Sequence, residues 1–266
     1  MTANEFLDIA LEAARAAGAL LVSAERPEVL STKSSPTDVV TQMDRQAEEL
    51  IRSRILAARP GDAILGEEGG QTGEATVRWV IDPLDGTVNY LYGLPDWAVS
   101  VAAEVSGVVL AGAVAVPRRR EMFTAVLGGG AWLESASGER VALRCGPGVP
   151  LDRALVATGF GYLPARREVQ GAVVAALLPR IRDIRRAGVA SADLCSVAAG
   201  RVDAFYERGL NYWDYAAGAL VAAEAGAVVG GLRGAPPSGS MTIAAGPKLF
   251  GALASVLAGL DADRDG

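Results

Sequence analysis

WVIDPLDGTVNY, residues 79–90, is the stretch that decides how the rest of the chain is interpreted. Its apolar run, residues 79–81, stops at Asp82, and a proline and a second acid, Asp85, follow within three residues. Such a run is typical of a buried strand, and the end of a strand is where an open sheet presents functional groups. Pro83 fixes the turn between the two acids, so we expect both carboxylates to point the same way.

The residues that follow Pro83 are suited to form an anion-binding site. The carbonyl of Leu84 is available as a further oxygen ligand, and Gly86 lets a ligand approach the backbone closely. Thr87 stands where a short helix can begin, with N–H groups suited to a phosphate. This layout is typical of metal-dependent phosphate chemistry. Taken alone, DPLDG is equally compatible with a surface turn, because Asp, Pro and Gly are turn residues.

Acids recur at the ends of other apolar runs, namely Asp38, Asp44, Glu67, Glu68 and Asp214. The chain has no histidine, which excludes Ser-His-Asp and Cys-His triads and most structural zinc sites. Clustered carboxylates then find their partner in a divalent cation, and all-oxygen ligands favour Mg²⁺, Mn²⁺ or Ca²⁺. Individually, the Glu67–Glu68 pair could be a solvated turn and Asp214 the N-cap of its helix.

Composition restricts the kinds of binding partner and the cellular compartment that we expect. The net charge of −6 gives nucleic-acid binding no electrostatic support, and the basic clusters at 118–120 and 180–186 are interpreted as solvated surface. No apolar run is long enough to cross a bilayer, and residues 1–21 lack the basic start of a secretory signal. Cys145 and Cys195 make no disulfide framework. We therefore expect a cytoplasmic protein that binds neither nucleic acid nor membrane.

The element pattern changes near residues 145–150, which predicts two subdomains, 1–147 and 148–266. The first is rich in antiparallel strands and carries two helices, whereas strands and helices alternate in the second. The glycines at 128–130 are predicted to form a hairpin turn, because no helix follows them. The fold class is therefore α/β, or α+β. The expected helices span about 4–24, 44–58, 168–178, 191–199, 214–225 and 248–257, and the expected strands include 63–65, 77–81, 154–158, 181–184 and 202–206.

With these residues in place, the sequence resembles the inositol monophosphatase family. WVIDPLDGTVNYLYGLP (79–95) is similar to that family's WxIDPxDGTxNF motif, and WDYAAGALVAAEAGA (213–227) to its WDxAAGxxxxxEAGG motif. GEEGG (66–70) and DVVTQMD (38–44) match further landmarks in order. Tyr90 and Ala227 depart from the motifs. The resemblance spans about residues 5–258 and implies a layered α-β-α-β-α sandwich that forms a homodimer.

The resemblance also implies roles for individual residues. Glu67 and Thr87 would activate the attacking water, with Asp44 near Thr87, and Lys33 would lie in a loop able to approach a metal. Val189 stands where the family usually has threonine. Two or three Mg²⁺ ions would be ligated by Glu67, Asp82, the Leu84 carbonyl, Asp85 and Asp214. Substrate would be bound by Asp85, Gly86, Thr87, Gly188, Val189, Ala190, Glu207 and Asp214.

The implied activity is Mg²⁺-dependent hydrolysis of a phosphomonoester, myo-inositol 1-phosphate above all, by a metal-activated water. Related phosphatases acting on fructose 1,6-bisphosphate, histidinol phosphate or 3′-phosphoadenosine 5′-phosphate share the metal motif. Glu207 and the GTVNYLYGLP context favour the inositol type. A different alternative is an added binding role, because some bacterial relatives also bind the transcription machinery. The basic residues at 180–186 are the feature that could serve such a partner.

Overall fold

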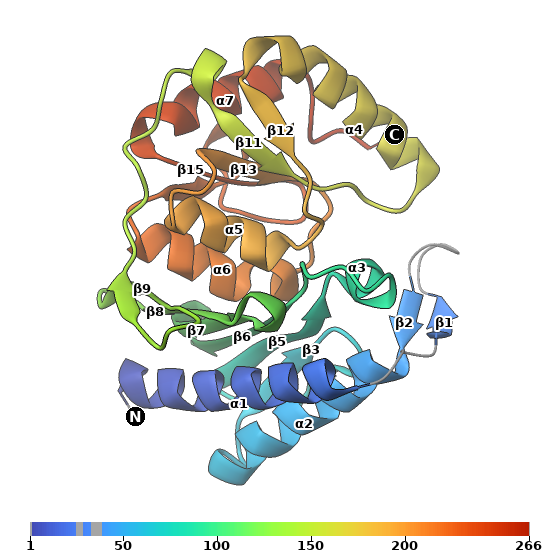
Figure 1. Cartoon of the computed structure of the whole chain (residues 1–266), viewed down its shortest axis with the longest axis vertical. Coiled ribbons are helices and arrows are strands. Elements are labelled where there is room, and N and C mark those ends of the chain that lie inside the picture. The colour runs from blue at the N-terminus through green and yellow to red at the C-terminus, as the bar shows by residue number, and fades with distance from the viewer. Residues whose placement is uncertain (1, 25–28, 33–38, 266) are drawn as a thin grey trace.

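The computed structural model describes residues 2–24, 29–32 and 39–265, which form five alternating layers (Figure 1). Two helices cover one face of an eight-stranded sheet, two more helices separate that sheet from a five-stranded one, and a last helix pair covers the outer face. The predicted α-β-α-β-α sandwich is therefore confirmed. None of the helices in the described ranges is long and apolar enough to cross a bilayer.

The first layer consists of α1 (Ala3–Ser23) and α2 (Gln42–Ala58). The buried face of α1 is mostly alanine at helical spacing, which lets the helix approach the sheet closely. At Gly18 an added Cβ would lie 2.8 Å from Cγ of Pro117, so only glycine fits there. Both helices begin at a threonine, Thr2 or Thr41, in a capping box. Helix α2 therefore begins two residues before the predicted start.

The large sheet has the strand order β10-β9-β8-β7-β6-β5-β3-β4. Its neighbours are antiparallel except for the parallel pair β3 and β5. The glycines at 128–130 do form a turn, as predicted, and N–H groups of Gly128 and Gly130 donate to the carboxylate of Glu224. The strands are β3 (Ala63–Gly66), β4 (Gly70–Thr72), β5 (Val77–Asp85), β6 (Ala98–Val105), β7 (Val108–Val116), β8 (Glu121–Val126), β9 (Gly130–Glu134) and β10 (Arg140–Ala142). A separate pair joins β1 (Val29–Thr32) and β2 (Val39–Thr41).

Strand β5 continues past its predicted end at residue 81 and includes both acids of the opening stretch. Asp82 pairs with Ser100 and Asp85 with Ala98, so three steps along β5 match two steps along β6. Residues three apart in a regular strand point to opposite faces, and the extra residue of a bulge reverses this. Pro83, which has no N–H to donate, lies within the bulge. The bulge therefore puts Asp82 and Asp85 on the same face.

The second sheet has the order β12-β11-β13-β15-β14, with β12, β11 and β13 parallel to one another. Helix α4 begins earlier than predicted because Pro164 occupies its first turn. The strands are β11 (Leu155–Thr158), β12 (Asp183–Arg185), β13 (Ala204–Glu207), β14 (Val228–Gly230) and β15 (Thr242–Ala245). Helices α4 (Pro164–Leu177) and α7 (Pro247–Gly259) cover the outer face of this sheet, and α5 (Ala190–Ala198) and α6 (Tyr212–Glu224) lie between the two sheets. Short 3-10 helices lie in connections: η1 (Pro117–Arg119), η2 (Leu151–Arg153), η3 (Leu178–Arg180) and η4 (Leu232–Gly234).

The middle layer packs on both sheets. Ala217 of α6 lies against the large sheet so closely that a Cβ at Gly112 would be 3.1 Å from its Cα. On the other side, Leu194 of α5 and Ala222 of α6 share a buried cluster with Phe205 of β13. Helices of the second predicted subdomain thus complete the core of the first. The division at 147/148 remains a prediction about sequence organisation, because the two halves share this layer.

Candidate active site

A cavity of about 380 Å³ lies where the end of β5 meets the beginnings of α5 and α6. It brings together every predicted site residue except Asp44 and Val189. Lys33 and Asp38 lie outside the described residues. The predicted residues that line the cavity are Glu67, Asp82, Leu84, Asp85, Gly86, Thr87, Gly188, Ala190, Glu207 and Asp214.

Four carboxyl groups from three parts of the chain influence one another here. Asp82 and Asp85 come from the β5 bulge, Glu67 from the turn after β3, and Asp214 from the first turn of α6. Burial, followed by the charge of Glu67, raises the pKa values of Asp82 and Asp214 well above their usual range. Asp82 also makes a side-chain hydrogen bond with Glu67, which requires a proton on one of the two carboxyls.

Backbone donors hold two of these acids in place. The N–H of Leu84 donates to Oδ1 of Asp82 at 3.0 Å. The N–H of Asn211 donates to Oδ2 of Asp214 at 2.6 Å, as part of a capping box. Asn211 is therefore the N-cap of α6, and the alternative that Asp214 is the N-cap is wrong. Because Asp214 is the third residue of α6, its position is set by the start of that helix.

Asp85 is held by a residue that the sequence interpretation missed. The N–H of Ser191 donates to Oδ2 of Asp85 at 2.8 Å, and the Ser191 hydroxyl donates to the same oxygen at 2.6 Å. Burial raises the pKa of Asp85 to about 6, and the hydrogen bonds from Ser191 and the Ala190 N–H limit that rise. The only signal in the sequence is a serine directly after residues 188–190, at the start of an apolar helix.

Replacing Ser191 with alanine should lower kcat/KM for phosphate release by about tenfold and raise the Mg²⁺ concentration needed for half-maximal rate, because residues that orient metal ligands contribute about 10–100-fold. Steady-state assays across a Mg²⁺ titration measure both effects. Ser196→Ala is the control, since that hydroxyl donates to the Ala192 carbonyl of its own helix. Equal losses in the two variants would contradict a role for Ser191 in holding Asp85.

Asp44 does not line the cavity, but it accepts a hydrogen bond from Thr87, which does. Its Oδ2 accepts from the N–H of Thr41 at 2.8 Å, and its Oδ1 accepts from the Thr87 hydroxyl at 2.9 Å. The Thr87 Oγ1 also lies 3.1 Å from the Leu84 carbonyl oxygen. A hydroxyl has one proton, and the carboxylate is the stronger acceptor. The structure thus directs the Thr87 proton toward Asp44.

Gly86 and Val189 meet at the wall of the cavity. Gly86 has φ +92°, and an added Cβ would lie 2.9 Å from Cγ2 of Val189 and 3.4 Å from the Gly188 carbonyl oxygen. Glycine is therefore required on grounds of both conformation and space. Val189 is buried at 1 % exposure and does not line the cavity. The Val189 side chain thus packs behind Gly86, and contact of this residue with substrate stays a prediction.

The donor set suits a hard divalent cation. Carboxylates and a backbone carbonyl supply only oxygen, and a cation would relieve the repulsion that raises the pKa values of Asp82 and Asp214. Across the described residues, no three Asp, Glu or Cys side chains form a ready-made chelating group.

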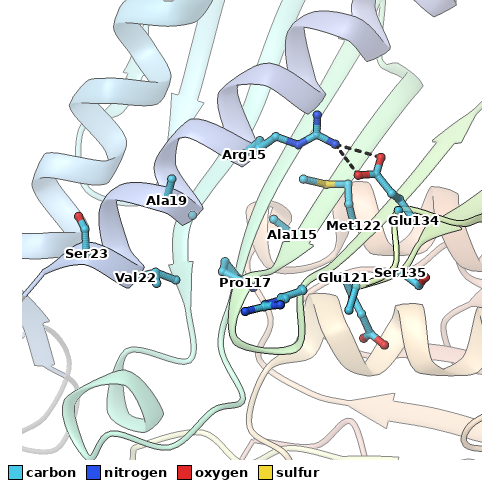
Figure 2. A pocket seen from close by; sticks show the side chains of 14 residues that line it. Arg15, Ala19, Val22, Ser23, Ala115, Pro117, Glu121, Met122, Glu134 and Ser135 are labelled. Carbon is cyan, nitrogen blue, oxygen red and sulfur yellow. Dashed lines mark hydrogen bonds and ion pairs between the residues drawn. The ribbon is translucent and has the colours of Figure 1, made fainter.

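A second, larger cavity of about 520 Å³ lies between α1, η1, β8 and β9 (Figure 2). Small and apolar side chains such as Ala19, Val22 and Met122 line much of it, and Arg15 donates to both Glu134 oxygens at 3.0 Å. It contains none of the predicted site residues. Arg120 and Glu121 also line it, and the Glu121 carboxylate is paired with Arg201. We assign this cavity no chemistry.

A five-layer α/β sandwich with an acid-lined pocket at the junction of its halves defines a class of layered α/β phosphatases. The family model of the inositol monophosphatase family matches residues 2–260, and the chain belongs to that family. The “Inositol-1-monophosphatase SuhB” of Mycobacterium tuberculosis is 49% identical over 234 residues, 85% of this chain and 80% of the relative. The “Nus factor SuhB” of Pseudomonas aeruginosa is 44% identical, covering 86% of each.

Solved structures agree with this assignment. The structure of Mycobacterium tuberculosis SuhB superposes with a TM-score of 0.84 at 42% identity and covers 99% of each chain. An inositol monophosphatase from Anabaena superposes with a TM-score of 0.83 at 32% identity, over 96% of each chain. The family is generally Mg²⁺-dependent, in agreement with the oxygen-only donor set of the pocket.

Proposed function

We propose that this chain hydrolyses myo-inositol 1-phosphate to myo-inositol and phosphate with Mg²⁺. The observation that carries the proposal is the convergence of Glu67, Asp82, Asp85 and Asp214 on the pocket that also contains Thr87. Family membership and the name of the Mycobacterium tuberculosis relative support the choice of reaction and substrate. We extend the proposal to a homodimer in the cytoplasm, on the family resemblance and on the two free cysteines, Cys145 and Cys195.

When bound, two or three Mg²⁺ ions held by the four acids and the Leu84 carbonyl would lower the pKa of water and neutralise the phosphate. The Thr87 hydroxyl donates to Asp44, which leaves Thr87 Oγ1 lone pairs to accept a hydrogen bond from the attacking water. Glu67 would accept the proton of that water. The N–H groups of Gly86 and Thr87, at the start of α3 (Thr87–Leu91), would hold phosphate oxygens.

Glu207 also lines the pocket, and we propose that it binds substrate hydroxyls. Its carboxylate lies over Gly159, where an added Cβ would be 2.1 Å from Oε2. Burial and the charges of Asp193 and Asp85 raise the pKa of Glu207 to about 8, although Arg186 opposes the rise. A carboxyl group that titrates near neutral pH can donate or accept a hydrogen bond, which suits a polyol substrate.

A substrate panel tests the proposal. Phosphate release would be measured with Mg²⁺ and with EDTA from myo-inositol 1-phosphate, fructose 1,6-bisphosphate, histidinol phosphate and 3′-phosphoadenosine 5′-phosphate. We expect release to require Mg²⁺ and to be fastest, in kcat/KM, from myo-inositol 1-phosphate. A higher kcat/KM for another compound would leave the proposed metal site standing and overturn the choice of substrate. Phosphate release in EDTA would overturn the metal dependence.

A second candidate function is an added role in binding the transcription machinery. The relative named “Nus factor SuhB” favours it, and the exposed Arg180, Arg182 and Arg185 offer a basic surface. The retained set of acids argues against a purely structural role. Recovery of an RNA polymerase component from cell extract, equally by the wild type and by Asp85→Asn, would support binding that is independent of catalysis. The expectation of no nucleic-acid binding stays a prediction.

A further inference from the structure

The proposed metal site combines acids from two layers of the fold (Figure 1). Asp82 and Asp85 belong to β5 of the large sheet, whereas Asp214 is the third residue of α6 in the middle layer. The N–H of Asn211 fixes Asp214 relative to its own helix, but it does not fix that helix relative to β5. Mg²⁺ demands near-ideal octahedral geometry. The contacts that hold the start of α6 on the large sheet therefore bear on metal binding.

A buried pair of charges lies on the face of β5 and β6 that α6 covers. Arg78 of β5 and Glu104 of β6 are opposite each other in the strand register. Nη2 of Arg78 lies 2.9 Å from Oε1 of Glu104 and donates to Oε2 at 3.0 Å. Two residues away on the same face, Val80 and Ala102 pack in the buried cluster that includes Ala217 of α6. The Glu104 side chain is only 7% exposed, so the pair lies at the edge of this core.

Tyr212, the first residue of α6, reaches this pair. Its hydroxyl donates to Oε2 of Glu104 at 2.6 Å, a length typical of a hydrogen bond to a charged oxygen. The Arg78 guanidinium lies over the Tyr212 ring, with 5.6 Å between Cζ and the ring centroid. The Tyr215 ring meets the Tyr212 ring edge-on, with the two centroids 5.4 Å apart. The Tyr212 side chain is thus held both at its hydroxyl and at its ring.

A second link joins the same turn of α6 to β6. The hydroxyl of Ser100 donates to the carbonyl oxygen of Trp213 in a longer hydrogen bond of 3.4 Å. Ser100 is buried and lies opposite Asp82 in the register of β5 against β6. Tyr212 and Trp213 directly precede Asp214 in the sequence. The two residues before this acid therefore contact the strand pair that carries Asp82.

We propose that Tyr212 is a positioning residue: its hydrogen bond to Glu104 fixes Asp214 relative to the acids of β5 and thereby sets the affinity for Mg²⁺. The proposal rests on the phosphatase function proposed above and adds a determinant of the same site. Neutralisation of Glu104 does not require Tyr212, because Arg78 already places a positive charge 2.9 Å away. What the hydroxyl adds is a directed contact between helix and sheet, two residues before the acid.

Tyr212→Phe tests the proposal, because it removes the hydroxyl, keeps the ring and leaves Glu104 paired with Arg78. We expect the Kd for Mg²⁺, measured by isothermal titration calorimetry without substrate, to rise by about tenfold, within the range found for residues that orient metal ligands. The Mg²⁺ concentration for half-maximal phosphate release should rise in parallel, whereas kcat at saturating Mg²⁺ should change little. A lower Tm in EDTA with an unchanged Kd would show a merely structural role and contradict the proposal.

Tyr215→Phe is the matched control on the same helix. Tyr215 directly follows Asp214, and its hydroxyl donates to the Pro237 carbonyl at 3.4 Å, outside the large sheet. This variant should keep the wild-type Kd for Mg²⁺, and a loss equal to that of Tyr212→Phe would contradict a specific role for the contact with Glu104.

A variant of the partner provides a rescue test. Glu104→Gln keeps an oxygen that can accept the Tyr212 hydrogen bond, so its Kd for Mg²⁺ should stay closer to wild type than that of Tyr212→Phe. Glu104→Leu removes the acceptor and should weaken Mg²⁺ binding. Adding Tyr212→Phe to Glu104→Leu should cause no further loss, because both changes remove the same contact. Additive losses would overturn the proposal.

The two readouts separate this proposal from the phosphatase function. If the wild type binds Mg²⁺ but releases phosphate from no compound of the substrate panel, the proposed function fails, and the Kd values still decide the role of Tyr212. Equal Kd values for the wild type and Tyr212→Phe would overturn that role and leave the proposed function standing wherever phosphate is released. A wild type that binds no Mg²⁺ would overturn both.

Discussion

Asp85→Asn should reduce phosphate release from myo-inositol 1-phosphate by at least about a thousandfold, because metal-ion catalysis contributes several kcal/mol and each ~1.4 kcal/mol is tenfold in rate. Asp85 is the acid for which the structure provides the most complete support, with two donors from Ser191 on one oxygen. Asparagine has nearly the same shape and keeps an oxygen to accept those bonds. The loss should therefore appear in turnover and in Mg²⁺ dependence rather than in the amount of folded protein.

Steady-state assays at saturating Mg²⁺, together with circular dichroism, measure this effect. Asp152→Asn is the matched control, because Asp152 lies exposed in η2, away from the pocket. It should retain wild-type activity. If Asp85→Asn retained more than about a tenth of the wild-type rate at saturating Mg²⁺, the assignment of Asp85 as a metal ligand would be wrong.

Mg²⁺ should raise the midpoint of thermal unfolding by about 5 °C or more, because a ligand at about a hundred times its Kd adds ~2.7 kcal/mol and each kcal/mol shifts Tm by roughly 2–4 °C in a chain of this size. The physical reason is the repulsion and burial that raise the pKa values of Asp82 and Asp214 without a cation. For the same reason, Asp82→Asn should raise the Tm measured in EDTA. Differential scanning calorimetry with and without Mg²⁺ checks both statements.

The thermal stability of the metal-free protein should also depend on pH. The raised pKa of Asp85 determines whether stability rises or falls with pH. Its pKa is about 6 in the folded chain against 3.8 for the unperturbed group. The resulting destabilisation is complete above pH 6 and disappears as the pH falls toward 3.8. Lowering the pH of the EDTA-treated protein within that window should narrow the difference in Tm between wild type and Asp85→Asn, because wild-type Asp85 is increasingly protonated there. A fall in Tm on adding Mg²⁺ at pH 7.5 would contradict this account.

Most helices and strands and the main acids could be predicted from the residues, because periodicity and acids at strand ends are local signals. The layered arrangement was predicted from the family resemblance. The bulge that puts Asp82 and Asp85 on the same face was not foreseen, since it depends on the register of β5 against β6. The contact of Ser191 with Asp85 and the burial of the Val189 side chain were not foreseen for a related reason. Whether a residue at the start of α5 faces Asp85 or packs behind Gly86 depends on how two distant segments meet.

The arginines that line the active-site pocket could not be predicted either. Arg166, Arg186 and Arg208 are separated in sequence by loops and strands, and only the packing of the second half brings them to the same cavity. Their neighbours in sequence give no hint, because short basic clusters usually lie on solvated surface.

The middle layer that packs on both sheets determines how the chain loses its structure. Because α5 and α6 fill the core between the two sheets, neither half can open without exposing apolar surface of the other. The molecule should therefore behave as one cooperative unit rather than as two foldons, with amide protons of both sheets exchanging through the same global opening. Fragments cut between residues 147 and 148 would each lack part of a core. Such a split chain would be active only when its two fragments reassociate.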